Sequence, residues 1–232
     1  MIKRYPYSEL GRANHGWLDA RHHFSFSQYY NPKRMSFGSL RVINDDIIAA
    51  GTGFDTHPHQ DMEIITYVRT GAISHKDSNG NSGRTKAGDV QVMSAGTGIY
   101  HSEFNLEDEA TTLYQIWIEP NQRGVKPRWD SHEFPQATDE GLTLLVSGDG
   151  NAPLQIHQDA FIYAGRLAKG SQLTQAIKHQ AYVLVSAGAI DVDGEVAEKG
   201  DGLEVMNQDA LNITAKEDAE VLVLDVPENN GQ

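Results

Sequence analysis

The sequence predicts an all-β protein that folds as two similar β-barrels in one chain. Three observations support this prediction. Short runs rich in Val, Ile and Tyr follow one another along the chain, with few helical patterns among them. Turn-forming Gly, Asn and Asp residues separate these runs. A pattern in the first half also recurs in the second half. The 232 residues are enough for one large domain or two small ones.

The strand-like runs occur at regular intervals in both halves. Strands at such spacing are typical of a sandwich or barrel. The segment DSNGNSG (77–83) contains an Asn-Gly pair, which is the strongest short signal for a hairpin. The runs cover residues 38–45, 63–77, 89–96, 112–120, 142–149, 160–167, 181–194 and 219–227.

Two segments without strand character are expected to be loops or single turns. The first is NPKRMSFG (31–38), and the second is DSHEFPQATDEG (130–141). The second is rich in Pro, Asp and Glu, so we expect it to link the two halves. The predicted domains are therefore an N-terminal barrel, residues 1–135, and a C-terminal barrel, residues 136–232.

The repeat consists of Gly-Ala-Ile, a hairpin and then Gly-Asp. The first half reads VRTGAISHKD and then KAGDVQVMSAG, and the second reads LVSAGAIDVDG and then EKGDGLEVMNQDA. Aligning Gly71 with Gly188 and Gly88 with Gly200 relates the halves in order over roughly thirty positions. Each half is thus expected to be a barrel built on the same plan.

Composition excludes several classes of function. With 19 Lys and Arg against 32 Asp and Glu, the net charge of −13 disfavours direct nucleic-acid binding. The absence of cysteine excludes disulfides, thiolate metal sites and cysteine nucleophiles. No apolar run is long enough to span a bilayer, and the first residues lack a signal region. We therefore expect a cytoplasmic protein without a membrane partner.

Histidine spacing indicates a metal site. Because residues i and i+2 of a strand share a face, His57 and His59 point the same way, and by the same parity so does Glu63. In GTGIYHSEF, His101 and Glu103 are also two apart. Imidazole and carboxylate together suit a divalent first-row metal, and an open coordination position is typical of a catalytic site. Strand spacing does not choose between the two glutamates.

The other histidines and the N-terminal aromatic residues are expected to be mainly structural. His15, His22 and His23 lie in the aromatic stretch before residue 32, and His75 and His132 are expected in turns. The aromatic side chains of this stretch would pack it onto the first barrel or provide a wall for a flat substrate. They are Trp17, Phe24, Phe26, Tyr29 and Tyr30.

Two motifs resemble those of the cupin superfamily. GTGFDTHPHQDMEIITYVRTG (51–71) resembles the first cupin motif, with one extra residue before its last Gly. GDVQVMSAGTGIYHSEFN (88–105) resembles the second, with Ser94 in place of proline and two extra residues before His101. These departures and the two-barrel length resemble the pirin branch of cupins. HGWLDARHHFSFSQYYNP (15–32) resembles bacterial pirin-like proteins with quercetin dioxygenase activity.

The resemblance implies a bicupin, in which both barrels are jelly-rolls, also called double-stranded β-helices. It implies one divalent transition metal held by His57, His59, His101 and Glu103. Fe(II) is favoured, and Ni, Co, Cu, Mn or Zn would suit the same ligands. Glu63, the ligand in other cupins, would instead orient a ligand by a hydrogen bond.

The second barrel is expected to bind no metal, because the repeat alignment places other residues at the ligand positions. His157 and His179 are out of register with the first-barrel ligands and are expected to be ordinary packed or exposed histidines. The residues at the aligned positions are Thr174, Ala176, Gln180, Ile213 and Ala215.

Two functions are consistent with this site. The resemblance implies an oxidoreductase of the quercetin 2,3-dioxygenase (quercetinase, or quercetin 2,4-dioxygenase) type, which cleaves flavonols with O2. Glu103 or Glu63 would accept the proton of the flavonol hydroxyl. The alternative is a regulatory protein that senses metal redox state and binds a protein partner, as proposed for eukaryotic pirins. Flavonol turnover discriminates between the two.

Overall fold

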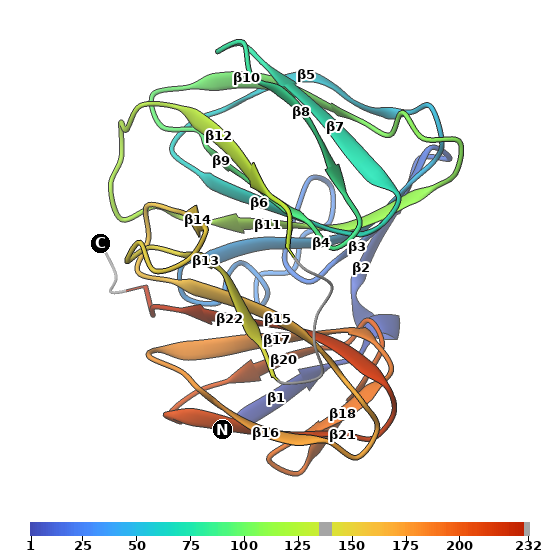
Figure 1. Ribbon diagram of the computed structural model, residues 1–232, viewed down its shortest axis with the longest axis vertical. Helices are drawn as coiled ribbons and strands as arrows, with labels where there is room; N and C mark the ends of the chain where they lie inside the picture. The colour runs from blue at the N-terminus through green and yellow to red at the C-terminus, as the bar shows by residue number, and fades with distance from the viewer. Residues whose placement is uncertain (135–140, 230–232) are drawn as a thin grey trace.

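The computed structural model describes residues 1–134 and 141–229. It is built almost entirely of β-strands arranged as two barrels, one above the other in Figure 1, which confirms the predicted fold class. A short 3-10 helix, η1 (Tyr7–Glu9), interrupts the strands near the start of the chain. In the described residues, no helix has the length and apolar character needed to cross a membrane.

The N-terminal barrel consists of two facing sheets. The larger has the strand order β12-β9-β6-β11-β4-β3-β2, and the smaller has the order β5-β10-β7-β8. All pairings within both sheets are antiparallel. The strands are β2 (Gly11–Asn14), β3 (Leu18–His22), β4 (Leu40–Ile48), β5 (Gly53–His59), β6 (Glu63–Thr70), β7 (Ala72–Asp77), β8 (Ser82–Lys86), β9 (Val90–Ser94), β10 (Ile99–Phe104), β11 (Thr111–Ile118) and β12 (Arg128–His132).

The C-terminal barrel repeats this plan. Its sheets have the orders β1-β20-β17-β22-β15-β13-β14 and β16-β21-β18-β19, and only the β13–β14 pair is parallel among its described strands. The strands are β1 (Ile2–Tyr5), β13 (Thr143–Ser147), β14 (Leu154–Gln155), β15 (Phe161–Leu167), β16 (Gln172–Ala176), β17 (Gln180–Ala187), β18 (Ala189–Val192), β19 (Glu195–Glu198), β20 (Gly202–Val205), β21 (Ala210–Ala215) and β22 (Ala219–Val226).

The repeat predicted from the sequence is present in the backbone. Gly71 and Gly188 follow β6 and β17 with φ of +73° and +71°. Gly88 and Gly200 precede β9 and β20 with φ of +87° and +90°. L-residues with a side chain rarely adopt such angles, so glycine at these four turns fixes the same strand-to-strand geometry in both barrels.

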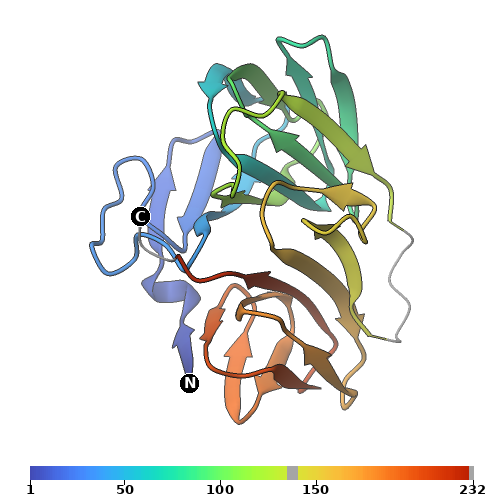
Figure 2. The ribbon, with the colours of Figure 1, turned by 90° about the vertical axis from the view of Figure 1, so that its left-hand side faces the viewer.

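Strand β1 belongs to the C-terminal barrel, although we expected residues 1–135 to form the N-terminal one. It pairs antiparallel with β20, and Figure 2 shows the N-terminus beside the lower barrel. The Arg4 Nε donates to Asp201 at 2.8 Å, and the Tyr5 hydroxyl donates to Glu204 at 2.9 Å. These charged and polar contacts hold the strand at the edge of the second sheet.

Two further segments contain strands that the sequence analysis does not predict. The N-terminal stretch forms a hairpin, β2–β3, because LDARH alternates buried Leu18, Ala20 and His22 with half-exposed residues. The segment 130–141, expected as a loop, begins with the last residues of β12, which pairs with β9. Residues 135–140, where we place the domain boundary, lie outside the described residues.

The two barrels share one hydrophobic core. Strand alternation directs Ile65 and Tyr67 of β6 toward the second barrel, whereas Thr66 points into the first. Because this core joins side chains from both halves, the barrels form one packed unit. Its members include Ile43, Tyr114 and Ile116 from the first half and Tyr182, Leu184, Leu222 and Leu224 from the second.

Candidate metal centre

Three histidines meet where β5 lies beside β10. The antiparallel register sets His101 directly opposite His57, and His59 follows His57 on the same face. One ring nitrogen from each histidine lies within 4.8 Å of those from the other two. The ring centroids are 4.5 Å apart for His57 and His101, and 4.9 Å for His59 and His101. The structure therefore brings the three predicted histidines together.

Two of these histidines, His59 and His101, are held in the neutral form, which has a lone pair available for a metal. Burial, reinforced by His57 and His59, lowers the pKa of His101 to about 2. Burial and His57 also lower the pKa of His59 to about 4. The buried Nε2 of His101 has no hydrogen-bond partner in the described part of the chain. Three clustered imidazoles, one of which has an unpaired buried nitrogen, fit a divalent transition metal.

Glu103 lies beside His101 and is fixed by two amides. Its Oε1 accepts a hydrogen bond from Gln91 Nε2 at 2.7 Å, and its Oε2 accepts one from Gln115 Nε2 at 2.6 Å. Burial raises the pKa of this carboxyl. Glu103 forms a second group within 4.8 Å with His75 and His101, and it is not part of the three-histidine group at that distance.

His75 was expected in a turn, but it lies on β7 and is buried. Its Nε2 is 2.8 Å from Asp77 Oδ2, and its ring stacks on Trp129 with centroids 4.9 Å apart. An ionised carboxylate only accepts, so His75 donates through Nε2, and in the tautomer that carries its proton there Nδ1 is an acceptor. His101 Nδ1, 3.4 Å away, can then donate to His75, which leaves His101 Nε2 unprotonated as a metal ligand requires.

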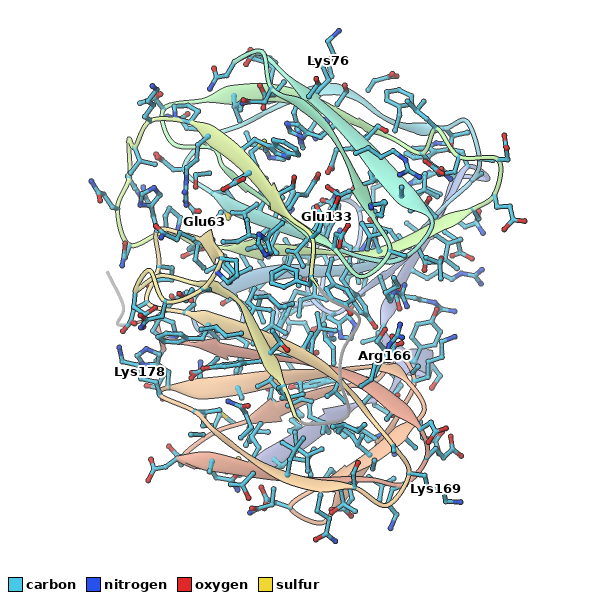
Figure 3. The ribbon with its side chains drawn as sticks, in the orientation of Figure 1. Glu63, Lys76, Glu133, Arg166, Lys169 and Lys178 are labelled. Carbon is cyan, nitrogen blue, oxygen red and sulfur yellow. The ribbon has the colours of Figure 1, made fainter. Side chains whose placement is uncertain are left out.

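Glu63 lies away from the histidines, and the expectation that it shares their face is wrong. Residues 60–62 end β5, and Glu63 then begins β6 in the opposite sheet. Its Oε2 accepts a hydrogen bond from Ser94 Oγ at 2.7 Å, and it lies near Arg128 and His157. Figure 3 shows Glu63 at the lower edge of the upper barrel, close to β14. Burial raises the pKa of this carboxyl.

A cavity of about 800 Å³ opens in front of His57 and His59. The β2–β3 hairpin and the following loop line part of it, so the N-terminal stretch forms a wall of the pocket as well as packing on the barrel. The N-terminal stretch and the barrel strands both contribute aromatic and imidazole side chains to the cavity lining. Besides His57 and His59, these side chains are His15, Trp17, His22, Phe26, Tyr29, Phe54 and Trp117.

The other histidines and aromatic residues considered in the sequence analysis lie away from the cavity. Phe24 packs in the core between the barrels. His23 Nδ1 lies 2.9 Å from the Tyr182 hydroxyl in the same region. Tyr30 is 72% exposed. His132 lies on β12 rather than in a turn.

The C-terminal barrel contains no group of three metal-ligating side chains among its described residues. His179 Nε2 lies 3.1 Å from Asp159, and His157 lies near Glu63. The positions aligned with the ligands lie on β16, β17 and β21, and none is a histidine or carboxylate. The second barrel therefore keeps the scaffold without the ligands.

Comparison with known proteins identifies the family. A model described as Pirin matches residues 5–118, and one described as Quercetinase C-terminal cupin domain matches residues 144–226. Over 231 residues, the chain is 46% identical to quercetin 2,3-dioxygenase of Escherichia coli K12, covering 98% of this chain and 99% of that one. This chain belongs to the pirin family. The pirin is also 50% identical to a pirin-like protein of Caulobacter vibrioides over 230 residues, covering 97% and 99% of the two chains.

A solved relative contains a metal. The pirin resembles the crystal structure of the bacterial pirin YhhW from Escherichia coli in complex with nickel(II), with a TM-score of 0.93 and 44% identity. The match covers 98% of this chain and 100% of that one. Together with the histidine group, this likeness supports a single transition-metal site in this pirin.

Proposed function

We propose that this pirin is a cytoplasmic, metal-dependent dioxygenase that cleaves flavonols such as quercetin with O2. One observation carries the proposal: three clustered histidines, one with an unpaired buried nitrogen, adjoin an aromatic cavity of about 800 Å³. That volume is within the range of small-molecule sites. The quercetin 2,3-dioxygenase of Escherichia coli, 46% identical to this chain, supports the substrate class.

His57, His59, His101 and Glu103 would hold the metal. We favour Fe(II), while Ni, Co, Cu, Mn and Zn suit the same nitrogen and oxygen donors. When bound, the metal supplies a positive charge that stabilises a deprotonated substrate hydroxyl, and it supplies the redox chemistry toward O2. Each Glu103 oxygen accepts one amide hydrogen bond, from Gln91 or Gln115, and keeps a second lone pair that could coordinate the metal.

The protein side chains bind and orient the substrate. Phe26, Tyr29 and Trp117 provide faces against which a flat aromatic ring can stack. Glu103 is the proposed proton acceptor, because Glu63 lies at the face between the barrels, away from the histidines. The β2–β3 hairpin contributes apolar side chains such as Trp17 and Leu18 to the cavity wall beside the reacting groups.

The test is turnover by the metal-loaded protein. Protein purified without chelator would be analysed for metal, loaded with Fe(II) and mixed with quercetin in air. We expect loss of flavonol absorbance and release of CO, and neither when the protein carries His101→Ala. Metal binding without any turnover would contradict the dioxygenase proposal and favour the redox-sensing alternative.

A further inference from the structure

The side chains of two consecutive aspartates on β4, Asp45 and Asp46, point to opposite faces of the sheet. Asp45 faces the core between the barrels, where its carboxylate pairs with Arg69. Asp46 faces the other way, into the N-terminal barrel, as strand alternation requires. It is 2% exposed and lines the cavity that also contains His57 and His59. An acidic side chain is thus buried next to the candidate metal centre.

Asp46 lacks the hydrogen bonds that its polar neighbours have. On the same face of the sheet, His22 Nδ1 lies 2.7 Å from Asn44 Oδ1, and Gln115 donates to Glu103. Asp46 Oδ1 is buried and has no hydrogen-bond partner among the described residues. A buried carboxyl without a partner destabilises a fold. The packing of the free protein therefore does not explain Asp46, and a bound ligand would supply the missing hydrogen bond.

The charges around Asp46 favour its protonated form. Burial, followed by the nearby carboxylates of Asp45 and Glu103, raises its pKa well above the ordinary value, against a smaller opposing effect of Arg69. The other titratable groups that line the cavity are Arg12, His15, His22, Tyr29, His57 and His59. A protonated carboxyl both donates and accepts a hydrogen bond, as a hydroxyl does.

We propose that Asp46 is a ligand-contacting residue that hydrogen-bonds a hydroxyl of the hydroxylated aromatic molecule bound in this cavity. This proposal rests on the proposed function, and it names the group that recognises the substrate. An anionic ligand group would be repelled by Asp45 and Glu103, whereas a neutral hydroxyl pairs with a carboxylic acid in either direction. The aromatic lining of the cavity accommodates the ring that carries the hydroxyl.

The experiment compares Asp46→Ala, Asp46→Asn and, as matched control, Asp45→Asn in metal-loaded protein. Quercetin binding is titrated without O2 by the shift in flavonol absorbance, and Tm is measured on the same samples. We expect Asp46→Ala to weaken binding at least about tenfold. Asp46→Asn, which keeps a donor and an acceptor, should weaken it less. Asp46→Asn should also raise Tm by about 2–4 °C, because it removes the unpaired acid.

Asp45→Asn should do the reverse: it leaves Arg69 without its carboxylate, so Tm falls while quercetin affinity stays within about twofold. A lower Tm for Asp46→Asn, or unchanged binding by Asp46→Ala, would overturn the proposal, because Asp46 would then be structural or remote from the ligand. If wild type binds catechol through Asp46 but not quercetin, the flavonol function fails and the Asp46 proposal survives. If wild type binds neither phenol, both fail.

Discussion

His101 connects two networks through its two ring nitrogens. Its Nδ1 faces His75, which is tied to Asp77, and its Nε2 is the unpaired nitrogen of the histidine group. A carboxylate that fixes the tautomer of a ligating histidine is a recurrent feature of metal sites. Here the carboxylate of Asp77 acts through a second imidazole, that of His75, so two residues in series orient the proposed ligand His101.

Removal of this ligand should empty the site without unfolding the protein. We expect His101→Ala to lose at least about tenfold in metal affinity, because one of the nitrogen donors disappears. The C-terminal barrel folds without such ligands, so the circular dichroism spectrum should be unchanged. His179→Ala is the control, since that histidine contacts Asp159 instead and should leave metal content intact. An unfolded His101→Ala protein would mean that the site is structural.

The two glutamates should respond differently to neutralisation. Glu103→Gln should lower metal content strongly, because a neutral amide replaces the anionic oxygen beside His101. Glu63→Gln should leave metal content unchanged. The Glu63 carboxylate contacts Ser94, and both residues lie in the larger sheet, opposite the sheet that carries the histidines. Elemental analysis of both variants after identical purification measures this. Metal lost from Glu63→Gln and kept by Glu103→Gln would reverse the assignment.

Asp46 should make stability depend on pH. Its folded-state pKa is raised above the unfolded value, so the folded state holds the proton more tightly. The stabilisation of the folded state by this proton is complete below the unfolded-state pKa of Asp46, and it is lost as pH rises through the folded-state pKa. The Tm advantage of Asp46→Asn over wild type should therefore grow between pH 4 and pH 8, a window set by the unfolded value of about 4. A constant difference would show that Asp46 does not titrate there.

Individual residues were predictable from the sequence where strand alternation held without interruption. His57, His59 and His101 were found from i, i+2 spacing, and the strands place them as expected. The prediction for Glu63 was wrong because it extended the strand alternation of His57 and His59 across residues 60–62. The strand ends there, and Glu63 belongs to the next strand in another sheet. His75 was missed, although alternating buried residues in AISHKD could have revealed its inward direction.

At the scale of elements, Arg34 ties the loop after β3 to the second barrel. It is 6% exposed, and its guanidinium pairs with Glu204 and donates to the Tyr182 hydroxyl at 3.2 Å. Its Nε donates to the His23 carbonyl at 3.0 Å. The ring of Tyr5 on β1 lies 3.5 Å from the guanidinium carbon. One side chain thus joins the loop after β3, β1 and two strands of the second barrel.

Replacing Arg34 should therefore be severe. Arg34→Met leaves Glu204 buried without its partner, and we expect a loss of about 3–5 kcal/mol in the free energy of unfolding. Urea denaturation followed by fluorescence measures this loss. Arg84→Gln is the control, because its ion pair with Glu107 is exposed and should contribute no measurable stability. Equal effects of the two substitutions would contradict the role assigned to Arg34.

The positions of the strands were largely predictable from the sequence. The pairing of one strand with another was not always predictable. Runs rich in Val and Leu, such as 219–227, became strands because they are buried on both faces. Strand β1 could not be assigned to its sheet, since its partner β20 is about 200 residues away and pairing over such separation leaves no local pattern. The β2–β3 hairpin was hidden because its polar residues obscure a short alternation.

At the scale of the whole molecule, the shared core should make unfolding cooperative. Side chains from both barrels, including Ile116 and Leu222, pack in one cluster, so neither barrel can lose its structure without exposing the other's apolar face. We expect one calorimetric transition with equal calorimetric and van't Hoff enthalpies. Leu222→Ala, in the barrel without ligands, should lower the temperature of that single transition. Two separate transitions would show that the barrels unfold independently.

The pairing of β1 with β20 also has a consequence for how the protein is made. Residues 2–5 leave the ribosome early, but their partner strand, residues 202–205, is synthesised about 200 residues later. At 5–20 residues per second, that interval is roughly 10–40 s. During this time the first barrel can assemble while residues 2–5 wait, with their backbone amides unpaired, for residues 202–205 to emerge.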